Sequence, residues 1–367
     1  MLLLSLNERR NSSRTIVKTM RAYLMQDHEL EKELAFSGLE IGKAVRRRIY
    51  SIPKYRRGDV RASSMAMKAQ DTSRAVDAEA EEICLSSLKK LSAKLSRRFR
   101  IILDPAADKV FEIGHHKDSE VIYAYLDPVD GSMKVAGLGN EPEKGIYRIG
   151  NNGCWGIGIA FTLPTSKQLS DLKIGDFQIA AIVDGNPTLY RTYPTNAVVY
   201  PVSGPRLQTY ECDESKRRHK LCTSSQKELS QATVLFDAFQ AFDTKSAKSG
   251  SQQLVVRIFE KLINRNEGGA FDIVRLYANI GETLRQLLER DGKRYRYEPQ
   301  SVGSITVNEN LPNLLPITSI IEGAGGQVVD FEGNPISGRA LKSERPNVIV
   351  AANLVIRDKL LNIVRDA

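Results

Sequence analysis

A strand that runs directly into two carboxylates is the feature of this sequence that most constrains its fold. Residues 121–126 (VIYAYL) are apolar, β-branched or aromatic, which is typical of a buried strand. Asp127 and Asp130 follow at once, with Pro128 between them. Ionised groups are costly to bury without partners, so the end of this strand must lie in a polar place. The sequence therefore predicts a site at the end of a core strand.

The first half of the chain predicts two helices packed on a sheet. Apolar residues recur with helical spacing over residues 29–49 and from Asp77 to residue 95. Strands are predicted at 100–104, 121–127, 155–163, 177–185, 188–194 and 197–202, the last four as an antiparallel run.

The second half alternates strands with helices, which is typical of a layered α/β arrangement. Strands are predicted at 232–239, 304–310, 327–333 and 347–353, and helices at 249–263, 271–289, 314–326 and 355–366. Surface loops are predicted at 211–220 and 342–347. We expect three parts: an N-terminal tail (1–28), a metal-binding α+β half (29–200) and an α/β half that contributes the substrate side (201–367).

Composition places the chain among soluble globular proteins without a membrane span. Its 367 residues are 41% hydrophobic and 26% charged, and no apolar run approaches the roughly 20 residues that cross a bilayer. The net charge of +9 includes basic clusters at 45–61 and 96–100. No nucleic-acid-binding module accompanies them, so solvated helix faces and linkers are the favoured interpretation, and a nucleic-acid partner is ranked last.

Cysteine usage suits a reducing compartment, and we expect a cytoplasmic protein. The Arg/Ser-rich leader at 1–18 has too short an apolar run for a signal peptide; a solvated tail is favoured, and organelle targeting stays open. His115 and His116 lie in a polar, loop-like stretch that favours a surface role. The four cysteines show neither CxxC spacing nor a neighbouring histidine cluster, which argues against a zinc site: Cys84, Cys154, Cys212 and Cys222.

The carboxylates at the end of the strand are suited to a hard divalent cation. Pro128 restrains the backbone between Asp127 and Asp130, and the carbonyl of Val129 can add a third oxygen, which together suit Mg²⁺. A helix that starts just after them would present backbone N–H groups to a phosphate, from Gly131, Ser132 and Met133. A metal beside a phosphate indicates metal-assisted phosphoryl transfer. A helix-capping turn explains the same residues, and this segment alone leaves both interpretations open.

Four segments in order resemble one family. The segment DPVDGS resembles the DP[IL]DG[ST] motif of the superfamily that contains inositol monophosphatases, fructose-1,6-bisphosphatases and phosphoadenosine-phosphate phosphatases. The resemblance extends to residues 68–88, 268–282 and 320–364, and it covers roughly residues 30 to 365. It implies an α/β fold, a layered α-β-α-β-α sandwich (the sugar-phosphatase fold), and a Mg²⁺-dependent phosphatase.

The resemblance also implies roles for particular residues. Asp127 and Asp130 match the metal-binding acids, and Val129 matches the position that lends its carbonyl to a metal. Ser132 matches the hydroxyl residue that activates the attacking water, and Asp77 matches the acid that hydrogen-bonds this hydroxyl. The alternative interpretation of Asp77 is a helix N-cap.

Two departures from the family pattern concern the metal site. Where the family has a glutamate ligand this chain has Asp104, with Asp108 and Glu120 as alternatives. Where the family has an aspartate for the second metal this chain has Asn313, which brings an oxygen without a charge. The site then falls from about four formal negative charges to three, so the second metal is expected to bind more weakly.

The resemblance also concerns the substrate side. Leu315 and Ile317 replace small residues there and are expected to crowd a substrate. Four basic residues are candidates for a second phosphate, although solvated surface is the default interpretation: Lys134, Arg217, Arg218 and Lys220.

Two functions of different classes follow. The first is a phosphomonoesterase that hydrolyses a small phosphorylated polyol, sugar or nucleotide. The second is a catalytically impaired member that binds a phosphometabolite or a partner. A homodimer, built on an exposed apolar face of the early helices, is also expected.

Overall fold

The computed structural model describes most of the chain from residue 28 to its end. The described residues are 28–52, 60–62, 72–103, 110–114, 120–130, 155–185, 196–203, 206–212, 217–238, 250–264, 268–275, 287–290, 301–309, 313–341 and 345–367. No helix among these residues is both long enough and apolar enough to cross a membrane.

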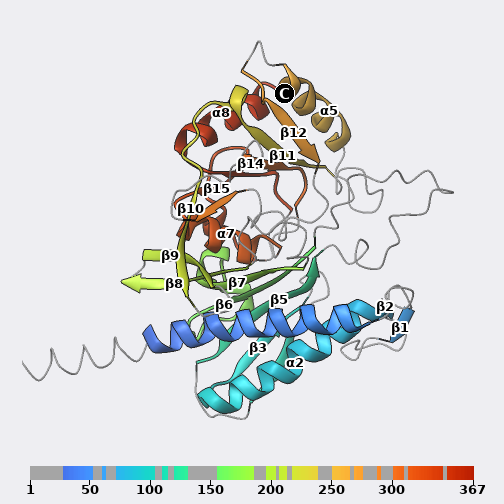
Figure 1. The fold of residues 1–367 in the computed structure, drawn as a ribbon, viewed down its shortest axis with the longest axis vertical. Helices are drawn as coiled ribbons and strands as arrows, with labels where there is room; N and C mark the ends of the chain where they lie inside the picture. Colours follow the sequence, from blue (N-terminus) through green and yellow to red (C-terminus); the bar gives the residue numbers. More distant parts are fainter. Residues whose placement is uncertain are drawn as a thin grey trace, which may run out of the picture.

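Helices and sheets alternate in five layers (Figure 1). The helix at residues 28–51 and α2 (Ala75–Leu95) cover one face of a nine-stranded sheet, with which they share one hydrophobic core. The other face of that sheet packs on α7 (Leu314–Gly323), which also contacts a five-stranded sheet. The outer face of the five-stranded sheet is covered by α5 (Ser251–Ile263) and α8 (Leu354–Arg365). The predicted α-β-α-β-α sandwich is therefore confirmed.

The nine-stranded sheet is mostly antiparallel, as predicted for its central strands. Its order is β13-β10-β9-β8-β7-β6-β5-β3-β4, in which only the pair β3–β5 is parallel. It joins strands from both sides of residue 200, so the two predicted halves share one sheet, and their boundary stays a prediction. The strands are β3 (Phe99–Ile102), β4 (Val110–Ile113), β5 (Ile122–Asp130), β6 (Gly156–Phe161), β7 (Ile179–Asp184), β8 (Asn196–Ser203), β9 (Arg206–Cys212), β10 (Arg218–Thr223) and β13 (Leu288–Arg290).

The five-stranded sheet is mixed, with the order β12-β11-β14-β16-β15. β11 pairs in parallel with both β12 and β14, whereas β16 runs antiparallel to β14 and β15. A separate hairpin joins β1 (Val60–Ala62) to β2 (Thr72–Arg74). The strands of the mixed sheet are β11 (Thr233–Asp237), β12 (Asp272–Arg275), β14 (Ser301–Thr306), β15 (Gln327–Asp330) and β16 (Val348–Ala351).

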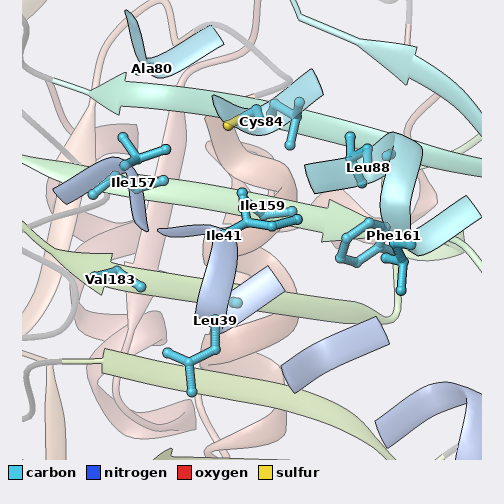
Figure 2. Packing of buried hydrophobic residues seen from close by; sticks show 14 of the residues in the cluster. Leu39, Ile41, Ala80, Cys84, Leu88, Ile157, Ile159, Phe161 and Val183 are labelled. Carbon is cyan, nitrogen blue, oxygen red and sulfur yellow. The ribbon is translucent and has the colours of Figure 1, made fainter. Parts of the chain in front are cut away.

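The first helix lies unusually close to the sheet because glycines form its contact. A Cβ added at Gly42 would lie 2.6 Å from a methyl group of Val183, and one at Gly38 would lie 3.1 Å from the ring of Phe161. Figure 2 shows side chains of both helices, among them Leu39 and Cys84, in one layer with those of β6 and β7. This packing holds β5, the neighbour of β6, under the two helices.

The early helices do not present the exposed apolar face that was expected for a dimer. Their apolar residues are buried in the core below them, and Tyr50, at 47% exposure, is the only large exposed hydrophobic residue among their described residues. Exposed apolar side chains lie instead on α5, at Val256, Phe259 and Ile263. The homodimer stays a prediction, which a molar mass measured by light scattering would decide.

Two predicted elements are wrong. Residues 271–289 were expected to form a helix, but the structure has β12 at Asp272–Arg275 and β13 at Leu288–Arg290, with residues 276–286 outside its description. Ile273 and Val274 are β-branched and pair with β11, so strand pairing prevails over the helical spacing. Residues 211–220 were expected to form a loop, but Glu211 and Cys212 end β9, and residues 218–220 begin β10.

The basic clusters at 45–61 and 96–100 supply contacts inside the molecule. Arg46 donates to the carbonyl of Asp184 at 3.1 Å, and Arg48 donates to Glu79 at 2.9 Å. Arg100 donates to Glu112 at 2.7 Å and to the hydroxyl of Tyr123. These bonds place Arg46 and Arg48 on a helix face, in line with the interpretation from the sequence, whereas Arg100 lies on strand β3 and not in a linker.

Asp330 organises the turn that follows β15. It is 1% exposed and accepts hydrogen bonds from Arg339 at 2.6 Å and from the backbone N–H groups of Glu332 and Asn334 at 3.1 and 2.8 Å. Burial alone would raise the pKa of Asp330, but the hydrogen bonds from Arg339 and Asn334 outweigh it and hold this pKa below its ordinary value. The ionised carboxylate therefore stabilises the fold.

We expect Asp330→Asn to lower the free energy of unfolding by about 2 kcal/mol at neutral pH, because hydrogen bonds to a charged acceptor are lost. Since the pKa is lower in the folded chain, this stabilisation is complete above the unfolded value of about 3.9 and is lost as pH falls through the folded value. Thermal unfolding of both proteins between pH 7 and pH 3 measures it. Equal unfolding midpoints of the wild type and Asp330→Asn at pH 7 would refute the prediction. Asp358→Asn is the control, because Asp358 forms an exposed ion pair with Arg357 whose loss should change stability little.

Candidate metal and phosphate site

A break in the pairing of β5 with β6 is what brings the two acids together. Asp127 pairs with Gly158 and Asp130 with Gly156, and the register shifts between them. β5 thus advances three residues while β6 advances two. In a regular strand, residues three apart point to opposite faces, and one extra residue reverses that alternation. Both carboxylates are therefore expected on one side of the sheet, opposite glycines that have no side chain.

The residues between the two acids fit the same geometry. Pro128 lies within the irregular stretch, where the loss of a backbone donor is tolerated. The side chain of Val129 is 7% exposed and belongs to the core under the two helices, which leaves its backbone carbonyl as the group it can offer. Asp127, Pro128 and Asp130 are only partly buried, unlike the five residues before them. β5 is thus a core strand whose last four residues, 127–130, reach a more polar and partly exposed region.

An acidic face of α2 adjoins the end of β5. Asp77, Glu81 and Cys84 lie at positions i, i+4 and i+7, on one side of the helix. Cys84 is fully buried; burial raises the pKa of its thiol, and the nearby carboxylates of Glu81 and Asp127 raise it further. Asp127 therefore lies near this face of α2. The structure assigns Glu81 to the site neighbourhood, which sequence analysis missed, although its spacing from Asp77 was the signal that could have found it.

Asp77 is not the N-cap of its helix. α2 begins at Ala75, so Asp77 is its third residue and lies within the first turn. A carboxylate there is favoured by the positive end of the helix dipole. The capping alternative is therefore wrong, while the expected role of Asp77 toward Ser132 stays a prediction.

A hydrogen bond between sequence-distant residues joins Asn313 to the strand that carries the acids. The hydroxyl of Tyr125, two residues before Asp127, donates to Oδ1 of Asn313 at 3.0 Å. Asn313 stands at the N-terminus of α7, but its side chain does not cap that helix. The structure thus brings Asn313 to β5, where its side-chain oxygen accepts a hydrogen bond from Tyr125. Its role as a metal ligand stays a prediction.

Other residues proposed from the sequence have different outcomes. Leu315 and Ile317 are fully buried in the core between the sheets, so the expectation that they crowd a substrate is wrong. Glu120 precedes the start of β5 and so lies more than about 15 Å along the strand from Asp127, which excludes it as a ligand of the same metal. Several residues lie outside the described parts of the chain: Asp104, Asp108, Gly131, Ser132, Met133 and Lys134.

The basic residues of β10 are remote from the acids. Arg217, Arg218 and Lys220 are exposed, and β10 is five strands from β5, which corresponds to about 24 Å. Arg218 donates to the hydroxyl of Tyr200 at 2.8 Å. A small substrate does not span this distance, so solvated surface remains the favoured interpretation of these three residues.

The donor set fits a hard cation. Carboxylates and a backbone carbonyl are the oxygen ligands that Mg²⁺ prefers. Within the described part of the chain, no three His, Cys, Asp or Glu side chains are grouped as metal ligands. Asp104, which the resemblance implies as a further ligand, lies outside the described residues.

Comparisons with known proteins identify the fold. No protein-family model matches the sequence. No curated protein matches it either. Among solved structures, the extragenic suppressor protein suhB from Bartonella henselae is similar, with a TM-score of 0.55 and 15% identity over 91% of this chain and 99% of that one.

Two further structures agree. The IMPase from Thermotoga maritima has a TM-score of 0.51 and 15% identity over 89% of this chain and 94% of that one. An inositol monophosphatase from Zymomonas mobilis has a TM-score of 0.51 and 13% identity over 93% and 98%. The chain has the fold of the inositol monophosphatases.

Proposed function

We propose that this chain, which has the inositol monophosphatase fold, is a Mg²⁺-dependent phosphomonoesterase that acts on a small phosphorylated polyol, sugar or nucleotide. The observation that carries the proposal is the register shift in β5, which is expected to bring Asp127 and Asp130 to one side of the sheet, the side on which Tyr125 contacts Asn313. Paired carboxylates at the end of a core strand are costly for folding, and a bound cation offsets that cost.

Asp127, Asp130 and the carbonyl of Val129 would hold the metal, with Asp104 and Asn313 as further ligands. When bound, Mg²⁺ supplies positive charge to the phosphate oxygens and lowers the pKa of water. Asp77 would accept the hydroxyl proton of Ser132, so that Ser132 can take a proton from the attacking water.

Gly131, Ser132 and Met133 would bind the phosphate, and the backbone N–H groups of Gly131 and Met133 would orient it. A new bond forms between the water oxygen and phosphorus, the ester P–O bond breaks, and the leaving oxygen takes a proton from solvent.

Phosphate release from inositol phosphates, fructose bisphosphate and phosphoadenosine phosphate tests the proposal. We expect release from at least one of them with excess Mg²⁺ and none with EDTA, because the carboxylates alone offer no positive charge to the phosphate. The proposal fails if no compound is hydrolysed at any Mg²⁺ concentration while the protein remains folded.

A second candidate is a catalytically impaired member that binds a phosphometabolite. It is favoured by the hydrogen bond from Tyr125 to Asn313, which engages the oxygen of a neutral residue at the expected second metal position. It predicts saturable binding of one of the same compounds, measured by calorimetry, without release of phosphate.

A further inference from the structure

A pocket lies at the edge of the five-stranded sheet, at the carboxyl ends of its parallel strands. β11, β14 and β15 run in the same direction, and β16 runs against them, so residues 331–332 after β15 and residues 345–347 before β16 lie at this edge. Two hydrogen bonds of 2.9 Å hold residues 345–347 beside the end of β14: Asn308 N–H to Asn347, and Glu309 N–H to the carbonyl of Pro346. The start of α5 completes the pocket.

This edge is also a point where the chain changes sides of the sheet. β11 leads to α5 on the outer face, whereas β14 leads to α7 on the inner face. In open α/β sheets, loops that part in this way leave a crevice at the carboxyl edge in which ligands bind. The residues of the candidate metal site, Asp77, Asp127, Asp130 and Asn313, do not line this pocket.

Three arginines line the pocket against one carboxylate. Arg257 comes from α5, Arg339 from the turn after β15 and Arg345 from the segment before β16, and Glu332 is the one carboxylate in the same lining. Arg339 is held by Asp330 at 2.6 Å, which orients its guanidinium. Arg257 makes no hydrogen bond or ion pair to any residue in the described part of the chain. The lining thus carries three positive charges and one negative charge, and the guanidinium group of Arg257 is available to bind an anionic ligand.

The rest of the lining adds backbone donors and apolar walls. Gly250, which has a left-handed φ of 82°, and Ser251 belong to the lining and form the N-terminus of α5, where backbone N–H groups have no partner within the helix. Leu254, Phe331 and Pro346 supply apolar surface. The volume of about 530 Å³ lies within the range of small-molecule sites.

We propose that this pocket binds a phosphomonoester dianion that also carries an apolar or ring-shaped part. Arg257, Arg339 and Arg345 bind the phosphate, because guanidinium groups donate paired hydrogen bonds to phosphate oxygens. Phe331 and Leu254 contact the organic part. Inorganic phosphate shares the charged group of this ligand but lacks its organic part, so it tests what Phe331 and Leu254 contribute.

The test is calorimetric titration of the full chain in EDTA, which suppresses hydrolysis, with phenyl phosphate and with inorganic phosphate. We expect phenyl phosphate to bind saturably, and Arg257→Gln to weaken it by about tenfold or more, since one charge-assisted contact is lost. Arg257 is exposed on its helix, so the unfolding midpoint of the variant should match the wild type. Glu332→Gln should tighten binding severalfold, because a repulsive carboxylate is removed.

Arg357→Gln is the matched control, because Arg357 lies on α8, outside the pocket, and pairs with its neighbour Asp358 at 2.7 Å. It should leave both affinities unchanged. We expect phenyl phosphate to bind more tightly than inorganic phosphate, because only phenyl phosphate can contact the apolar wall; equal affinities would overturn the assignment of an organic phosphomonoester. The proposal is overturned if the wild type does not bind either probe, or if Arg257→Gln and Arg357→Gln have the same effect. Neither result bears on phosphate release, so this test is independent of the proposed function.

Discussion

Asp127→Asn is expected to lower the rate of Mg²⁺-dependent phosphate release by about a thousandfold or more. The metal contributes several kcal/mol of charge stabilisation, and each ~1.4 kcal/mol corresponds to about tenfold in rate. Asparagine keeps the size of Asp127 and one oxygen, but it removes the charge at the position where β5 meets the acidic face of α2. Initial rates over a range of Mg²⁺ concentrations measure the loss.

Glu120→Gln is the control for this prediction. It removes a carboxylate before the start of the same strand, far from the register shift, and its rate should match the wild type. Unfolding midpoints of both variants separate a loss of chemistry from a loss of fold. A rate within about threefold of the wild type for Asp127→Asn would show that Asp127 does not hold the metal, since the loss of a ligand costs more than the loss of an outer partner.

Local sequence patterns were sufficient to predict most of the layers. The long helices have a strong apolar period, so the helix predicted at 29–49 is observed at 28–51, and the helix predicted from 314 is observed as α7. The strand β5 was predictable because its residues are apolar and it ends in carboxylates. By contrast, the segment that contains β12 has both helical spacing and β-branched residues, and only its pairing with β11 decides between them.

The geometry of the site depends on contacts that no local pattern encodes. The register shift of β5 is a property of its pairing with β6, and Pro128 was its only local signal. The bond from Tyr125 to Asn313 joins residues 188 positions apart. Sequence comparison could place Asn313 at a ligand position, but it could not show that its oxygen already accepts a hydrogen bond.

That bond leads to the second large prediction. Asn313→Asp is expected to lower the Mg²⁺ concentration for half-maximal phosphate release by about tenfold, because it restores one negative charge beside β5. Tyr125 can donate to a carboxylate as well as to an amide, so the contact between α7 and β5 survives the change. Rates at fixed substrate over a Mg²⁺ titration measure the shift.

Tyr125→Phe separates the charge from the hydrogen bond. It removes the hydroxyl from the oxygen of Asn313 without adding a charge, and it should cost about 1 kcal/mol of stability for the lost bond. If charge controls the second metal, Asn313→Asp shifts the Mg²⁺ dependence and Tyr125→Phe does not. If Tyr125→Phe alone produces the shift, the hydroxyl withholds the oxygen from the metal. If neither variant shifts it while Asp127→Asn abolishes activity, Asn313 does not serve a second metal and instead ties α7 to the strand that carries the acids.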